Sequence, residues 1–338
     1  MTSGERPLPE VDLTGDERER YHAVTDEVFA SYAEGRHAEA LERVRQAMPA
    51  LPSWRADLSH QAACLLAASG HPREALDELR AAFGEGAWWH RRIPVDDDDL
   101  APLRDLDGYA DLVERSHARA LEAADTTRSP LVARPPGTPV GLLVTLHGAG
   151  DDASGAARQW QAAVDAGFVL VAVESSQRST PRYRSWPDPA LAARDLDAAV
   201  AGLPATDRAL PLVTAGFSAG GRQAILWALA GRPGAPVAFV TVAPAVWPDQ
   251  VDDRHLADAV RRDVTGVILL GAADDDVGEG ALAMHARIRQ AGLACRLDHV
   301  AGLGHGYPAD FDLWLVRTLG ALSGTGSGHG AATARQDR

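Results

Sequence analysis

Three residue types that together perform nucleophilic catalysis occur in the second half of the chain, in the order serine, aspartate, histidine. Ser218 lies in the segment Gly216-Phe-Ser-Ala-Gly220, Asp274 follows Gly271-Ala-Ala, and His305 stands between two glycines. A histidine can take the proton of a serine hydroxyl, and a carboxylate can orient the imidazole and stabilise its charged form. These residues therefore predict attack of a serine on an acyl carbonyl.

The serine has the local context that a strained nucleophile requires. An apolar run at 211–215 precedes it, and a helical pattern follows from Arg222 onward. A Gly-x-Ser-x-Gly segment between a strand and a helix is typical of a nucleophile elbow, where side chains at the two glycine positions would collide with neighbouring backbone. The alternative is an ordinary glycine-rich turn, because in a chain with 32 glycines such a pentapeptide arises by chance at roughly the one-in-ten level.

The acid and the base each have competitors. Asp274, Asp275 and Asp276 follow the apolar run at 266–270, and at least two of them must be solvated residues that cap the next helix. His305 follows the apolar run at 294–300, on a glycine-rich loop that leaves its side chain free to approach a serine. The other histidines of this half are expected in a strand, in helices or in the tail, and they compete poorly: His299, His255, His285 and His329.

A second glycine-rich loop, His147-Gly-Ala-Gly150, follows the apolar run at 141–146. Such a loop can turn a backbone N–H toward the carbonyl oxygen of a bound ester. We expect the N–H groups of Ala149 and Ala219 to form the oxyanion hole, with Gly148 beside the substrate. His147 precedes the serine in the chain and is expected to organise this loop rather than to act as the base.

The elements that must position these residues alternate along the chain. Short apolar runs separated by helical patterns predict βαβ units and a mostly parallel sheet, whose strands end where ligands bind. Strands are expected at 131–133, 141–146, 168–173, 211–215, 237–242, 266–270 and 294–300. Helices are expected at 155–166, 189–202, 219–231, 251–262, 279–291 and 309–322.

From His147 to His305 the chain resembles the α/β-hydrolase superfamily, and within it serine esterases of the carboxylesterase/phospholipase and dienelactone-hydrolase type. The loops Glu174-Ser-Ser-Gln177 and Ser185-Trp-Pro-Asp188 are similar to those of predicted esterases of that group. The resemblance implies a doubly wound sheet with flanking helices, a small ester substrate and no cofactor. The family spacing G-x-x-D-x-x-V favours Asp274 as the acid. A thioesterase, amidase or acyltransferase would use the same triad, and a catalytically silent interaction protein is the rival class.

The N-terminal third has a different pattern. Residues 17–125 are rich in Ala, Glu, Leu and Arg, and Ala33–Leu41 is echoed by Ala68–Leu76 at an offset of 35 residues. The period and the G-x-x-x-E-A-L core resemble the tetratricopeptide helix-turn-helix repeat. Only two repeats and a degenerate third, around Asp99–Leu103 and a helix from Tyr109, can be recognised. We expect this region to pack on the rest of the chain, either as a buttress or as a binding surface for a protein or peptide.

The expected organisation is a flexible N-terminus (1–16), the repeat-like helical domain (17–125), a linker (126–140), the catalytic domain (141–322) and a disordered tail (323–338). A net charge of −14 over 338 residues argues against nucleic-acid and anionic-membrane partners. No apolar run approaches the roughly 20 residues that span a bilayer, and the polar N-terminus is no secretory signal. We expect a cytoplasmic protein.

Several further residues are candidates for substrate or ligand contacts. Trp186 and Trp247 lie on loops after strands and could line a pocket or pack on the fold. Arg178, Arg182 and Arg184 form a basic loop that could bind a carboxylate or phosphate, although a solvated, ion-paired loop is the simpler interpretation. Only two cysteines are present, Cys64 and Cys295, which excludes a disulfide framework; no metal site is expected.

Overall fold

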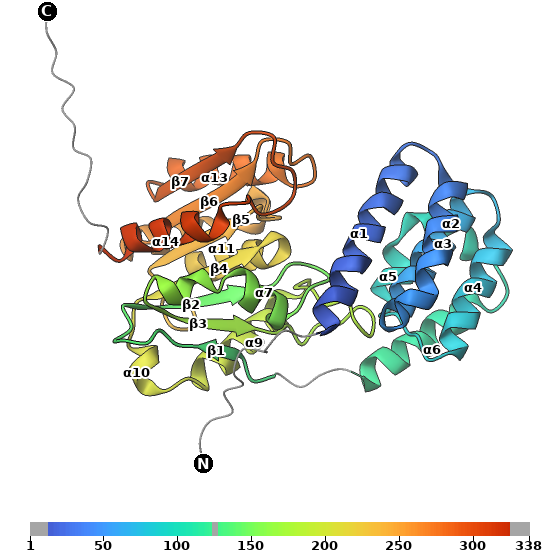
Figure 1. Cartoon of the computed structure of the whole chain (residues 1–338), viewed down its shortest axis with the longest axis horizontal. Helices are drawn as coiled ribbons and strands as arrows, with labels where there is room; N and C mark the ends of the chain where they lie inside the picture. Colours follow the sequence, from blue (N-terminus) through green and yellow to red (C-terminus); the bar gives the residue numbers. More distant parts are fainter. Residues whose placement is uncertain (1–12, 124–127, 325–338) are drawn as a thin grey trace, which may run out of the picture.

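The computed structural model describes residues 13–123 and 128–324, which form an all-helical region and a region built on one sheet (Figure 1). The first helix begins at Leu13, four residues before the expected start of the helical region. The expected flexible N-terminus up to residue 12, the start of the linker at 126–127 and the tail from 325 lie outside the described residues.

The helical region contains α1 (Leu13–Ala33), α2 (His37–Ala47), α3 (Arg55–Ala68), α4 (Pro72–Gly84), α5 (Arg92–Asp96) and α6 (Tyr109–Glu122). Short 3-10 turns occupy Met48–Ala50, Pro52–Trp54 and Asp98–Leu103. The 35-residue offset corresponds to two successive helical hairpins, α1–α2 and α3–α4. Gly35 and Gly70 occupy equivalent turns with φ of 71° and 81°, a region that favours glycine. The degenerate third unit corresponds to the 3-10 turn Asp98–Leu103 and α6, and it does not form a hairpin of two α-helices.

The sheet has seven strands in the order β1-β3-β2-β4-β5-β6-β7. They are β1 (Leu131–Ala133), β2 (Gly141–Leu146), β3 (Phe168–Val173), β4 (Leu212–Phe217), β5 (Ala238–Val242), β6 (Thr265–Gly271) and β7 (Ala294–Val300). Only β1, at the edge of the sheet, pairs antiparallel, so the expected linker contains an edge strand. The register aligns Leu146 with Gly216 and Gly271 with Val300, so the predicted motifs all follow the carboxyl ends of the parallel strands.

Helices cover both faces of the sheet, because successive side chains of a strand point to opposite faces. Leu142 and Val144 of β2 pack in a cluster with Leu196, whereas Leu143 packs in a second cluster with Leu315. The helices concerned are α7 (Ala153–Gln159), α8 (Ala162–Asp165), α9 (Pro189–Ala201), α10 (Ala205–Arg208), α11 (Ser218–Ala230), α12 (Asp253–Arg261), α13 (Gly278–Gln290) and α14 (Phe311–Leu322).

The single helix expected at 155–166 is divided into α7 and α8. The chain leaves the helical conformation at Trp160, where φ is −98° and ψ is 11°. The indole of Trp160 is completely buried, contacts the ring of Phe311 edge-on and donates a hydrogen bond to the Tyr307 hydroxyl at 3.2 Å. Burial of this large side chain accompanies the break. Within the described part of the chain, no helix combines the length and apolarity needed to cross a membrane.

Candidate active site

Ser218 lies at the junction of β4 and α11, in a backbone conformation that few residues other than glycine adopt. Its φ is 51°, in the left-handed region where a side chain is strained. The neighbouring glycines permit close backbone approach. A Cβ at Gly216 would lie 2.5 Å from the carbonyl carbon of Gly220, and one at Gly220 would lie 2.2 Å from the carbonyl oxygen of Leu146. This is the strained strand–turn–helix geometry that the sequence predicts.

The turn also carries a backbone donor with no acceptor inside the helix. Ala219 follows Ser218 in the first turn of α11, where N–H groups have no acceptor within the helix. The N-terminus of a helix favours negative charge. The Ala219 N–H is therefore placed to donate to an anionic group beside Ser218.

Asp274 and His305 are joined by a hydrogen bond. Nδ1 of His305 lies 2.9 Å from Oδ2 of Asp274, whose side chain is completely buried. The other carboxylate oxygen accepts the backbone N–H groups of Asp276 and Val277, both at 3.2 Å. Asp275 and Asp276 are exposed. The structure thus places Asp274, and not its two neighbours, on the imidazole.

His305 lies beside the residue that precedes the serine. Its ring centroid is 4.9 Å from that of Phe217, which stacks in turn on Tyr307. Among the described residues, no hydrogen bond joins His305 to Ser218. Because Nδ1 is engaged by Asp274, Nε2 is the nitrogen left for the serine, and catalytic hydrogen bonds are often long before substrate binds.

The loop after β2 is held in place by several contacts. Gly150, with φ of 77°, donates its N–H to the carbonyl of Arg184 at 2.8 Å, and Asp151 donates to Gly148 at 3.3 Å. Gly148 packs so closely on Phe217 that a Cβ would lie 2.8 Å from its ring. Ala149 is exposed, and within the described ranges its N–H has no protein acceptor. This N–H is free to meet a ligand.

His147 is buried under this loop and is neutral. Nε2 accepts the N–H of Ser175 at 3.2 Å, so Nδ1 carries the proton and donates to the carbonyl of Gly148 at 2.8 Å. Burial lowers the pKa of His147. Trp186 is also buried, and its indole N–H donates to the His147 carbonyl at 2.9 Å. His147 therefore organises the loop, as expected.

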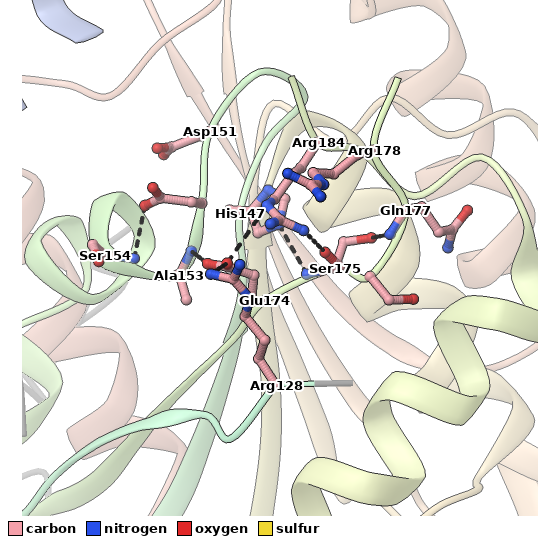
Figure 2. A network of polar contacts seen from close by, with 12 residues as sticks. Arg128, His147, Asp151, Ala153, Ser154, Glu174, Ser175, Gln177, Arg178 and Arg184 are labelled. Atoms are coloured by element: carbon pink, nitrogen blue, oxygen red, sulfur yellow. Dashed lines mark hydrogen bonds and ion pairs between the residues drawn. The ribbon is translucent and has the colours of Figure 1, made fainter. Parts of the chain in front are cut away.

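Glu174, named from the sequence only as the first residue of a loop and given no role, connects the loops after β2 and β3 (Figure 2). Its buried carboxylate lies 3.0 Å from Arg128 and 3.5 Å from Arg184, and it accepts the N–H of Ala153 at 3.2 Å. Arg184 also donates to the carbonyl of Ser175 at 2.7 Å. A glutamate directly after a buried strand was the available signal, because buried charges require partners.

Two family models match parts of the chain. Residues 137–291 match the family model of the serine aminopeptidases, S33, and residues 20–124 match a model described as the N-terminal domain of A/B hydrolase-like proteins. The sheet region has the α/β-hydrolase fold. The helical region thus matches a domain described as N-terminal in A/B hydrolase-like proteins, and its expected likeness to tetratricopeptide repeats stays a prediction.

Several solved structures are similar to this chain. An uncharacterized protein from Bacillus cereus ATCC 10987 is 21% identical with a TM-score of 0.52, and the match covers 90% of this chain and 99% of that one. The matched part of this chain therefore includes residues of the N-terminal helical region as well as the α/β-hydrolase region. Two further structures are less similar. Esterase PE8 is 21% identical with a TM-score of 0.48, and the match covers 57% of this chain and 98% of that one. Acyl-protein thioesterase 2 of Zea mays is 20% identical with a TM-score of 0.47, and the match covers 59% of this chain and 100% of that one. No curated protein matches the sequence.

The basic loop of the α/β-hydrolase region contacts the helical region. Arg178 donates to the carbonyl of Ala123, and its guanidinium lies 5.4 Å from the ring centre of Trp88. Arg184 is buried in the Glu174 network, and Arg182 is exposed. Two of the three arginines thus have internal partners, which favours the ion-paired loop over an anion-binding site.

The two candidate tryptophans differ in exposure. Trp186 is 1% exposed and anchors the loop at His147, so its indole does not face a ligand. Trp247 is 40% exposed and lies against the start of α13, where a Cβ at Gly280 would be 2.7 Å from its Nε1. Only Trp247 has a surface that could contact a substrate.

A cavity of about 530 Å³ lies between α1, α3 and the loops of the α/β-hydrolase region. Ala149, Thr180 and Tyr183 contribute from the α/β-hydrolase side. The helical side contributes aromatic, apolar and acidic residues: Tyr21, His22, Thr25, Asp26, Val28, Phe29, Tyr32, Asp57, His60, Gln61, Cys64, Leu65, Ile93, Asp97 and Asp99. Ala149 of the glycine-rich loop therefore borders a cavity whose wall is formed mostly by the helices.

Proposed function

We propose that this protein is a serine hydrolase that cleaves a carboxylic ester through Ser218, His305 and Asp274. The observation that carries the proposal is the 2.9 Å hydrogen bond from His305 to the buried Asp274, at the sheet edge where Ser218 occupies a strained turn. A histidine oriented by a buried carboxylate beside a serine elbow is the arrangement that activates a hydroxyl.

In the proposed reaction, a rotation of the Ser218 side chain brings its hydroxyl to Nε2 of His305. The serine oxygen attacks the acyl carbonyl while the imidazole takes its proton, and Asp274 stabilises the imidazolium through Nδ1. The protonated imidazole then donates to the leaving alcohol, which leaves an acyl-enzyme on Ser218. Water activated by His305 attacks this acyl group and restores the free serine.

The backbone N–H groups of Ala149 and Ala219 are the proposed oxyanion hole. Both belong to residues at the sheet edge, one on the glycine-rich loop and one in the first turn of α11. Removal of one such donor costs about 2.7–4 kcal/mol of transition-state stabilisation in a serine protease. The contacts of His147, Glu174 and Trp186 are proposed to keep the loop in position for this role.

We propose that the helical region forms part of the substrate site. Ala149 lines the cavity whose wall is largely helical, so an acyl or alcohol group bound next to the oxyanion hole can extend into it. Gly148 and Trp247 are proposed secondary contacts. This arrangement favours shaping of the substrate entrance over a peptide-binding groove as the role of the helices.

A thioester, an amide or transfer to an acceptor other than water would use the same residues. Short and long p-nitrophenyl esters, the matching thioesters and anilides distinguish these substrates by their relative kcat/KM. An interaction protein with a silent site would turn over none of them.

Covalent labelling by a fluorophosphonate probe tests the proposal. We expect one label per chain on the intact protein, none on Ser218→Ala, and full labelling on Ser69→Ala, which removes an exposed hydroxyl of the helical region. Ester turnover should follow the labelling. Equal labelling of Ser218→Ala and the parent protein, or none on either, contradicts a serine nucleophile at this position.

A further inference from the structure

Three potential metal ligands converge in the helical region, away from the serine. His60 and Cys64 lie one turn apart on α3, and Asp97 follows α5. Nε2 of His60 is 2.9 Å from Oδ2 of Asp97 and 3.6 Å from Sγ of Cys64, and Sγ is 3.5 Å from the same carboxylate oxygen. One nitrogen, one oxygen and one sulfur therefore face a common point.

The arrangement differs from a proton relay of the Cys-His-Asp kind. In a relay the imidazole uses one nitrogen for the thiol and the other for the carboxylate. Here Nε2 makes both contacts. The thiol and the carboxylate instead converge on one ring nitrogen, an arrangement that suits a shared central ion.

The distances approach those of a tetrahedral zinc site. Zn²⁺ binds imidazole nitrogen and carboxylate oxygen at about 2.0–2.2 Å and thiolate sulfur at about 2.3 Å, which separates neighbouring ligand atoms by roughly 3.3–3.7 Å. The two separations that involve Sγ fall in this range, and the shorter nitrogen–oxygen separation needs only a few tenths of an ångström. We propose that His60, Cys64 and Asp97 bind a divalent transition-metal ion, Zn²⁺ foremost.

The surroundings of the cluster hold the carboxylate for this role. Oδ1 of Asp97 accepts the backbone N–H of Asp99 at 3.0 Å, which leaves Oδ2 directed at His60 and Cys64. Asp99 in turn accepts a hydrogen bond from the Tyr32 hydroxyl at 2.7 Å. Such outer contacts orient metal ligands and tune their affinity.

The charge and the opening of the site also fit a cation. A thiolate and a carboxylate balance the two charges of the ion, and Cys64 releases its proton to solvent when the metal binds. All three ligands line the cavity of about 530 Å³ that Ala149 also lines. A three-residue site leaves the fourth tetrahedral position open, and it would be taken by water or by a donor atom of a cavity ligand.

This site is independent of the proposed hydrolase activity, which uses no metal. No metal site was expected from the sequence, because no cysteines and histidines cluster at ligand spacing. The proposed ligands are dispersed instead: His60-x-x-x-Cys64 places two of them on one helix face, and the third lies 33 positions further along the chain.

Metal titration of the full-length protein tests the site. After chelator treatment and its removal, we expect one Zn²⁺ per chain in competition with a chromophoric chelator. Cys64→Ser and Asp97→Asn should each lower the affinity at least about tenfold. Asn at 97 can still accept the Asp99 N–H, so this variant should keep the local fold. Cys295→Ser, at the other cysteine, should bind like the parent protein.

Cobalt gives a second readout that a structural role of these residues would not produce. With Co²⁺ we expect thiolate-to-cobalt charge-transfer absorption that is lost in Cys64→Ser and retained in Cys295→Ser. Thermal unfolding of each variant without metal establishes that it is folded. Absence of Zn²⁺ binding by the parent, or binding unchanged in folded Cys64→Ser and Asp97→Asn, overturns the proposal.

Discussion

At the scale of single residues, the candidate triad depends on which of three adjacent aspartates contacts the imidazole. Asp274 is buried and uses one carboxylate oxygen for His305 and the other for two backbone N–H groups. Asp275 and Asp276 face solvent. The backbone bonds hold the carboxylate in a single orientation, which suits a group that must keep an imidazole aligned.

Replacement of each aspartate by asparagine should distinguish the residue that orients His305 from its exposed neighbours. We expect Asp274→Asn to lower kcat for an ester substrate by about 10³–10⁴-fold, because the amide cannot stabilise the imidazolium or impose its tautomer. Asp275→Asn is the matched control and should stay within a few-fold of the parent. A similar loss in both variants, measured by steady-state kinetics, would show that Asp274 has no special role.

At the scale of elements, the site depends on strands that end in register. Leu146 of β2 lies opposite Gly216 of β4, so the glycine-rich loop and the serine turn leave the sheet side by side. The strand positions followed from apolar runs and agree with the structure within about two residues at each end. The division at Trp160 was not predictable, because the ring partners that enclose this side chain come from the C-terminal part of the chain.

The contact between these two turns requires Gly220. In Gly220→Ala the new Cβ would lie 2.2 Å from the Leu146 carbonyl oxygen, so backbone must shift. We expect a loss of about 1–3 kcal/mol in unfolding free energy and a loss of fluorophosphonate labelling. Gly278→Ala is the control, since no atom lies within 4 Å of its Cβ. Parent-like labelling and stability of Gly220→Ala would refute the steric argument.

At the scale of the whole molecule, the helical region is attached to the α/β-hydrolase region by polar contacts. Arg18 of α1 forms ion pairs with Asp151 and Asp152 beside the glycine-rich loop. The Thr180 hydroxyl donates to the buried carboxylate of Asp57 at 2.9 Å. These contacts place the helices over the loop that carries Ala149, and they support the buttress interpretation.

The buried Asp57 should make stability depend on pH. Burial raises the pKa of Asp57 to about 7, whereas the pKa of an aspartate in an unfolded chain is about 3.9. The folded protein therefore binds more protons between these values, and the stability that the protonated carboxyl contributes is lost as pH rises through about 7.

Asp57→Asn removes this titration and keeps an acceptor for Thr180. Between pH 5 and pH 8, the parent should lose stability relative to Asp57→Asn by on the order of 2 kcal/mol, as measured by urea unfolding. The exposed Asp77→Asn on α4 should show no such change relative to the parent. A stability difference between parent and Asp57→Asn that does not vary with pH would contradict the assignment.

The sequence by itself determined the features that depend on local sterics and periodicity. Alternating apolar runs predicted the sheet, and the 35-residue offset predicted the two hairpins. The glycines around Ser218 predicted its turn, because backbone that approaches closely excludes side chains within a few residues. The choice of Asp274 over Asp275 and Asp276 was implied by the spacing G-x-x-D-x-x-V of the family that the chain resembles, and position after the strand alone left all three open.

Only the tertiary structure decided the contacts between segments far apart in the chain. It buried Trp186 under the loop, assigned Arg178 and Arg184 to internal partners, and brought Asp97 to His60 and Cys64. The physical reason is that a charged or aromatic side chain acquires its role from whatever packs against it. Those partners are set by the docking of whole helices and loops, which no local pattern records.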